Sequence, residues 1–176
     1  MKKNRDVFGG EHMKNIYIIG GTMGVGKTTV CQLLKKELYN SVLLDGDWCW
    51  DSNPFQVTEE TKRMVLDNIC YLLNSFIRCS VYDNVIFCWV MHEQSIIDSI
   101  VNRIDNADCR VKKISLVCHE IALRKRLEKD VKQGIRTKDI IGRSIARIPL
   151  YEKLETIKID TSYMAPKDIV KKIIEI

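Results

Sequence analysis

The sequence predicts an α/β protein in which helices cover both faces of one parallel β-sheet. Five short apolar segments rich in β-branched residues alternate with longer segments whose apolar residues recur at helical spacing. This alternation favours parallel strands joined by right-handed helical crossovers. A chain of 176 residues suits one such domain and is short for two.

The elements follow one another in strand and helix order along the chain. The predicted strands are 16–20, 41–45, 84–90, 112–118 and 156–160. The predicted helices are 27–39, 59–79, 95–104, 121–131, 137–154 and 166–176. In the first helix Val30, Leu33, Leu34 and Leu38 form the apolar face, and Pro166 stands in the first turn of the last one. Ligands of such sheets bind beyond the carboxyl ends of the strands, which is where we look for the site.

Residues 21–28 read GTMGVGKT and satisfy the phosphate-binding pattern G-x-x-x-x-G-K-[ST]. The motif follows the first predicted strand and opens the first predicted helix, as its mechanism requires, and this position disfavours an incidental glycine-rich turn. Its glycines allow backbone N–H groups to surround an anion at the positive end of the helix dipole. Lys27 is expected to reach the β- and γ-phosphates of ATP, and the Thr28 hydroxyl to ligate Mg²⁺. The expected nucleotide contacts in this loop are Gly21, Thr22, Met23, Gly24, Val25, Gly26, Lys27, Thr28 and Thr29.

Two aspartates, Asp45 and Asp47, stand at the carboxyl end of the second predicted strand in "LLDGDW". Together with the loop at 21–28, this D-x-D pair resembles the P-loop small-molecule kinases, an AAA-type group that includes shikimate kinase, adenylylsulfate kinase, gluconate kinase and chloramphenicol phosphotransferase. The resemblance implies that Asp45 helps to hold Mg²⁺ and that Asp47 orients or deprotonates the acceptor hydroxyl. Ordinary turn chemistry at Asp-Gly is the alternative for this pair.

The same resemblance implies the P-loop NTPase fold, a three-layer αβα sandwich with strand order 2-3-1-4-5. It further implies a single domain over 13–176 with a short helical lid at about 128–142. The preceding residues 1–12 are polar and lack the apolar core of a secretory signal. We expect them to be a disordered N-terminal extension or a segment upstream of a natural start at Met13, because the sequence from Met13 enters the first strand almost at once.

Aromatic and histidine side chains flank the acidic pair in the predicted site. Trp48 and Trp50 are candidates for stacking on an acceptor ring, with packing beside the cleft as an equal alternative. The third strand ends in "VMHE" without a Walker B aspartate, which assigns the metal role to Asp45. His92 is a candidate for acceptor binding or acid–base catalysis, and it equally suits a strand end with no further role.

The segment from Arg110 to Lys153 is strongly basic, with 13 lysines and arginines against 5 aspartates and glutamates. In the resembled family, arginines of the lid close over the transferred phosphoryl group. The resemblance assigns this catalytic role to Arg136, Arg143 and Arg147, and it assigns nucleotide contacts to Arg124 and Thr161. A solvated basic face is the alternative for the segment.

Composition limits the partners. No Phe, Tyr or Trp occurs between Arg110 and Leu150, so the basic segment lacks the stacking platform of a single-strand nucleic-acid binder. No apolar run approaches the roughly 18 residues of a membrane span. Seven scattered cysteines without a C-x-x-C pair favour a reducing, cytoplasmic setting over disulfides or a zinc site.

The sequence thus predicts an ATP- and Mg²⁺-dependent phosphotransferase that acts on a small-molecule hydroxyl or phosphate acceptor. A nucleoside or nucleotide kinase is the alternative among enzymes, and a nucleotide-dependent regulatory or binding ATPase is the alternative of another class. The expected partner is a small-molecule acceptor, and nucleic acid and membrane are not expected. The chain is expected to be a monomer or a homodimer.

Overall fold

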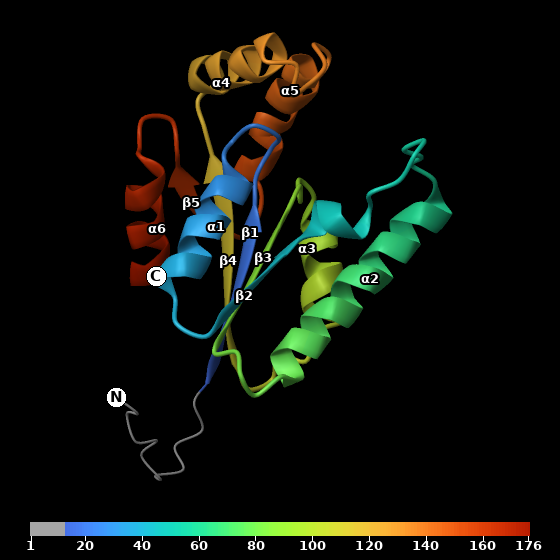
Figure 1. The fold of residues 1–176 in the computed structure, drawn as a ribbon, viewed down its shortest axis with the longest axis vertical. Helices are drawn as coiled ribbons and strands as arrows, with labels where there is room; N and C mark the ends of the chain where they lie inside the picture. The colour runs from blue at the N-terminus through green and yellow to red at the C-terminus, as the bar shows by residue number, and fades with distance from the viewer. Residues whose placement is uncertain (1–12) are drawn as a thin grey trace.

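A five-stranded parallel sheet forms the centre of the fold in the computed structural model, which describes residues 13–176 (Figure 1). The expectation for residues 1–12 lies outside the described residues. The order is β2-β3-β1-β4-β5, which confirms the predicted order. The strands are β1 (Lys14–Gly20), β2 (Ser41–Asp45), β3 (Asn84–Trp89), β4 (Cys109–Val117) and β5 (Ile157–Asp160).

Helices cover both faces of the sheet and its carboxyl edge. In Figure 1, α1 (Lys27–Glu37) and α6 (Pro166–Glu175) lie on one side of the sheet, and α2 (Glu59–Arg78) and α3 (Gln94–Val101) lie on the other. Above the carboxyl ends of the strands lie α4 (Glu120–Lys132) and α5 (Ile140–Glu152). The predicted three-layer αβα sandwich is therefore confirmed, with a helical pair over the carboxyl edge of its sheet.

Burial on both faces explains why the first strand reads as an unbroken apolar run. Successive side chains of a strand point to opposite faces. Ile16 and Ile18 accordingly join the core under α2 and α3, whereas Tyr17 and Ile19 join the core under α1 and α6. All four are at most 2% exposed. This burial fixes β1 at the centre of the sheet, so the loop that follows it opens at the middle of the carboxyl edge.

The boundaries of several elements differ from those that the pattern predicts. A short 3₁₀ helix, η1 (Gly46–Cys49), follows β2, because the Asp45 side chain accepts a hydrogen bond from the Asp47 N–H at 3.2 Å and caps the turn. β4 begins at Cys109 instead of residue 112, since its charged first half hides the strand pattern. α5 begins at Ile140, three residues later than predicted. Within residues 13–176 no helix is long and apolar enough to cross a membrane.

Candidate active site

The loop between β1 and α1 has the backbone of a phosphate cradle. Gly24 and Gly26 adopt φ values of 79° and 105°, which L side chains rarely tolerate. Conformations of this kind turn successive N–H groups toward a common centre. The Lys27 ammonium lies over the loop and donates to the carbonyl oxygens of Gly21 at 2.9 Å and Thr22 at 3.2 Å. The loop and its lysine therefore fit the phosphates of a nucleotide.

Burial lowers the pKa of Lys27, and the nearby Cys88, Asp47 and Asp45 side chains act in the opposite direction. A buried ammonium is stabilised by an anionic partner, because the partner's charge replaces the lost hydration. The two backbone carbonyls that accept from Lys27 replace its lost hydration only in part. A bound phosphate would supply the missing charge.

Gly24 also packs closely against α4. A Cβ at this position would lie 2.5 Å from Leu127 Cδ2 of α4. We expect Gly24→Ala to lower the free energy of unfolding by about 1–3 kcal/mol, because the left-handed backbone and the contact are both strained. Urea denaturation measures this change.

Gly142 in α5 is the matched control for Gly24, since a Cβ there meets nothing within 4 Å. Gly142→Ala is expected to raise stability by about 0.5–1 kcal/mol, because alanine favours the helix. Equal stability of the two variants would contradict the strained geometry at Gly24.

Asp45 and Thr28 form a pair of oxygen ligands beside the cradle. The Thr28 hydroxyl donates to Asp45 Oδ2 at 2.9 Å, and Asp45 is 5% exposed. Carboxylate and hydroxyl oxygens are the donors that Mg²⁺ takes when it also binds nucleotide phosphates. The pair therefore fits Mg²⁺, as the sequence predicts for both residues.

Asp47 lies beside this pair and has both negatively and positively charged side chains nearby. Burial and the neighbouring Asp45 raise the pKa of Asp47, whereas Lys27, a hydrogen bond from the Trp89 indole and Arg136 lower it. Asp47 is thus within electrostatic reach of the cradle lysine and of a lid arginine. Trp89 was missed by sequence reasoning, because the last residue of an apolar strand carries no polar signal.

A cavity of about 550 Å³ opens beside Asp47 at the carboxyl edge of the sheet. It brings together Asp47, Trp50, His92, Arg143 and Arg147, which the sequence predicts as site residues. Its remaining lining residues are Met23, Phe55, Val57, Lys62, Val65, Leu66, Trp89, Val90, Glu93, Ile96 and Ile140. Trp48 does not line the cavity, and its side chain is turned to solvent at 58% exposure.

The three arginines expected to close over the phosphates have different surroundings. Arg147 reaches it directly, with Nη1 2.8 Å from the Met23 sulfur. Arg143 lines the cavity and pairs with Asp139 at 2.8 Å. Arg136 pairs with Asp130 at 3.3 Å and is not among the residues that line the cavity. Its positive charge nevertheless acts to lower the pKa of Asp47.

The two residues expected near the nucleotide base have different surroundings. Arg124 is paired with Glu120 at 2.8 Å on an exposed part of α4. Thr161 is 1% exposed, and its hydroxyl donates to the carbonyl oxygens of Val25 at 3.3 Å and Val117 at 3.1 Å. Thr161 therefore contacts the backbone of the cradle at Val25, and its buried side chain does not face an open surface.

Arg126, which the resemblance considers together with Arg124 as a residue near the nucleotide base, ties the cradle to the segment after β5. Its guanidinium donates to the carbonyl oxygen of Val25 at 3.2 Å and to the Thr161 hydroxyl and the Ser162 carbonyl oxygen, each at 3.2 Å. No sequence signal separates Arg124 from Arg126, because each stands three residues from one of the two buried leucines of α4. The contacts of Arg126 depend on how α4 packs against the cradle, which the spacing of the two arginines does not indicate.

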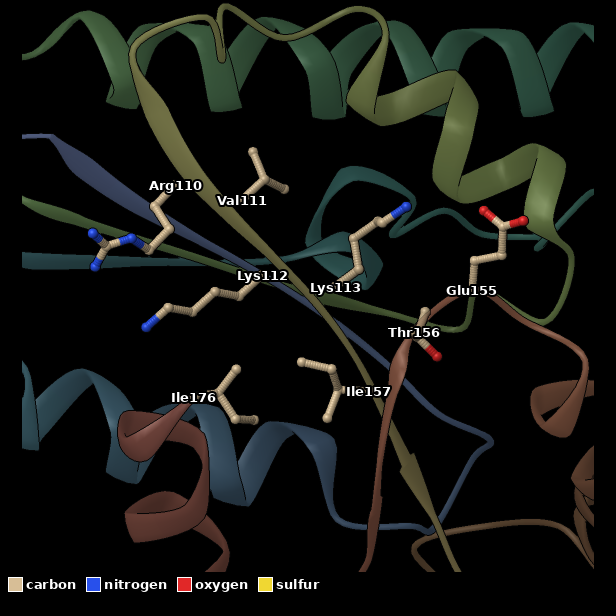
Figure 2. A pocket seen from close by; sticks show the side chains of 8 residues that line it. All are labelled: Arg110, Val111, Lys112, Lys113, Glu155, Thr156, Ile157 and Ile176. Carbon is tan, nitrogen blue, oxygen red and sulfur yellow. The ribbon is translucent and has the colours of Figure 1, made fainter.

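A second cavity, of about 540 Å³, lies at the opposite edge of the sheet, at the amino ends of β4 and β5 (Figure 2). In Figure 2, Arg110 and Lys112 extend to one side of β4 and Lys113 to the other. The Lys112 ammonium lies 3.4 Å from the Tyr17 hydroxyl and 4.7 Å from the centre of its ring. Because the cradle follows the carboxyl end of β1, this cavity does not belong to the same site.

The fold of the chain is similar to that of several solved structures, two of which are described as kinases. A gluconokinase from Sinorhizobium meliloti is 16% identical, with a TM-score of 0.66 over 91% of this chain and 89% of that one. A sugar kinase from Janibacter sp. is 13% identical, with a TM-score of 0.66 over 93% of each chain. The tunicamycin resistance protein of Deinococcus radiodurans is 16% identical, with a TM-score of 0.67 over 92% of this chain and 94% of that one.

A comparison with curated proteins found no match. A family model described as an AAA domain matches residues 18–146, which include the cradle, the acidic pair, the cavity-lining end of β3 and about half of α5. Since this match spans most of the chain, the protein belongs to the AAA domain family, with the fold of the P-loop small-molecule kinases.

Proposed function

We propose that the protein is a phosphotransferase that uses ATP and Mg²⁺ to phosphorylate a small molecule. The observation that carries this proposal is the position of Asp47 between the cradle lysine and an open cavity of about 550 Å³. A P-loop protein that only hydrolyses ATP needs room for a water molecule at this point. A cavity of this volume is in the range of small-molecule sites.

The cradle side of the site provides for the phosphates. The loop amides and Lys27 stabilise the negative charge that the transferred group carries in the transition state. Thr28 and Asp45 hold Mg²⁺, which when bound neutralises charge on the phosphate oxygens. Arg147 and Arg143 extend from the lid toward the same space, and Arg136 adds positive charge from farther away.

The acceptor side of the site depends on Asp47. Its carboxylate accepts the proton of an acceptor hydroxyl as the hydroxyl oxygen attacks the γ-phosphorus. The new bond joins that oxygen to phosphorus, and the bond from phosphorus to the bridging oxygen of ADP breaks. The lysine and arginines stabilise the charge that ADP gains. A phosphate acceptor would need no proton transfer, and Asp47 would then only orient it.

A transfer screen with γ-labelled ATP tests this function. The protein is incubated with a mixture of nucleosides, sugars and antibiotics, and labelled organic products are separated and counted. Labelling of at least one acceptor supports the proposal. Intact ADP binding with no labelled organic product would favour the nucleotide-dependent regulatory ATPase instead.

The metal role of Asp45 leads to a separate prediction. Asp45→Asn is expected to raise the Mg²⁺ concentration for half-maximal transfer by about 10- to 100-fold, because one anionic oxygen ligand becomes neutral. Titration of transfer rate against Mg²⁺ at saturating ATP measures the shift. Asp51→Asn, an exposed carboxylate in the next loop, is the matched control and is expected to leave the titration unchanged. An Asp45→Asn variant with normal Mg²⁺ dependence would contradict the assignment.

A further inference from the structure

The amino end of β4 carries charged side chains on a face that is apolar farther along the strand. Ile114 and Leu116 belong to the core under α1 and α6. Because successive side chains of a strand alternate between the two faces, Arg110 and Lys112 point to this same face. A strand that packs on a core places apolar residues at such positions. The two charges therefore need a reason other than core packing.

The cavity shown in Figure 2 lies where β4 extends beyond β5. Ile114 is the first residue of β4 to pair with β5, and its partner in register is Ile157. Residues 110–113 pair with β1 on one side and, among residues 13–176, with no strand on the other. These four residues line the cavity together with Glu155, Thr156, Ile157 and Ile176. The space beside the amino half of β4 is therefore open to a ligand.

Lys112 is a buried cation without an anionic partner. It is 9% exposed although it lines the cavity. Its ammonium lies 3.4 Å from the neutral Tyr17 hydroxyl, and neither Lys112 nor Arg110 forms an ion pair with any carboxylate of residues 13–176. Burial and, after it, the charge of Arg110 lower the pKa of Lys112. Buried charges are costly unless they are paired, so this ammonium lacks a counter-charge.

Protection of an open strand edge is the alternative role for these cations, since lysines at sheet edges hinder pairing with another chain. Lys113 suits that role, because it is only partly buried and extends to the other side of β4 (Figure 2). Lys112 does not, because a charge that repels other chains works best when it is exposed. Glu155 is the one acid among the residues that line the cavity, and in Figure 2 it lies on the side to which Lys113 extends.

We propose that this cavity is a second anion-binding site, which takes a phosphate group either as the free ion or at one end of a small phosphorylated metabolite. The Lys112 ammonium and the Arg110 guanidinium would donate to its oxygens. Two neighbouring cations suit a doubly charged phosphate better than a single carboxylate. The cavity volume of about 540 Å³ leaves room for the rest of a metabolite beside Ile157 and Ile176. This site does not depend on the proposed function.

Calorimetric titration in the presence of saturating ADP and Mg²⁺ tests the site, because the nucleotide keeps other phosphates out of the cradle. The probes are inorganic phosphate, glycerol 3-phosphate and glucose 6-phosphate, with glycerol and glucose as uncharged controls. At least one phosphate-bearing probe is expected to bind, and the uncharged controls are not. Tightest binding by inorganic phosphate identifies the free ion as the ligand, whereas tighter binding by a phosphate ester identifies a metabolite. Absence of binding by all three would overturn the proposal.

A variant of Lys112 locates the bound phosphate. Lys112→Met keeps the apolar stem, removes the charge and is expected to weaken binding of that probe about tenfold or more, through loss of a charged hydrogen bond. Because the change removes a buried unpaired charge, the fold is expected to persist. Lys167→Met removes an exposed lysine at the other end of α6 from Ile176. It is the charge-matched control with unchanged affinity, and equal affinity of the two variants would overturn the proposed position.

Arg110→Gln provides a second test on an exposed side chain, whose loss does not threaten the fold. It is expected to weaken binding about three- to tenfold, because a charged donor becomes a neutral one. A ligand that binds only the folded chain also raises its melting temperature. The probe is therefore expected to raise the melting temperature of the wild-type protein, with ADP and Mg²⁺ present, more than that of Lys112→Met. An equal rise in the two proteins would contradict the site.

Discussion

Lys27→Ala is expected to lower the rate of phosphoryl transfer by about 100- to 1,000-fold, because the transferred group loses its nearest positive charge. The Lys27 ammonium lies over the cradle and donates to two backbone carbonyl oxygens there. Since burial lowers the pKa of this lysine, its removal relieves a desolvation cost and the fold is expected to persist. Single-turnover transfer from labelled ATP measures the effect.

Lys36→Ala provides the control for Lys27, because this lysine stands on the same helix and is exposed. It is expected to transfer phosphate at the wild-type rate. A Lys27→Ala protein that is folded and retains more than about a tenth of the wild-type rate would contradict the role of the lysine in stabilising the transition state.

Asp47→Ala is expected to leave ATP affinity unchanged and to lower the transfer rate by about 100- to 10,000-fold, the usual range for loss of a general base. Because Asp47 lines the cavity that we propose for the acceptor, binding of the triphosphate is not expected to depend on its carboxylate. Removing a negative charge near the phosphates would, if anything, favour ATP. Equilibrium binding of ATP and single-turnover transfer, measured on the same preparation, separate the two effects.

Asp47→Asn refines this test by keeping the size of the side chain and an oxygen for the Trp89 indole. It is expected to be as slow as the alanine variant, because an amide cannot accept the proton of the acceptor. A large loss of ATP affinity in both variants would contradict the assigned role and would place Asp47 on the nucleotide side of the site.

The fold could be predicted because its signals are local in the sequence. The unbroken apolar run of β1 reflects burial on both faces, and the cradle motif follows it directly. The position of Asp45 and Asp47 also followed from local order, since both come after the second strand. Element ends were less accurate, since β4 begins three residues earlier and α5 three residues later than predicted.

The set of residues that line the cavity beside Asp47 could not be predicted, because it depends on how strands far apart in the sequence pair in the sheet. Asp45 pairs in register with Cys88, so the next residues, Gly46 and Trp89, meet, and a Cβ on Gly46 would lie 2.5 Å from the Trp89 ring. This contact sets Trp89 beside Asp47. Likewise, the 3₁₀ turn after β2 decides that Trp50 lines the cavity and Trp48 does not. Neither outcome has a signature in the spacing of the tryptophans.

The central claim is that the phosphate held by the cradle passes to an organic acceptor. The most direct test is to follow ADP, inorganic phosphate and phosphorylated acceptor together in one reaction with an acceptor identified by the screen. The proposed function predicts that ADP and phosphorylated acceptor rise in equal amounts and that inorganic phosphate stays low. Equal production of ADP and inorganic phosphate, with the acceptor unchanged, would contradict it.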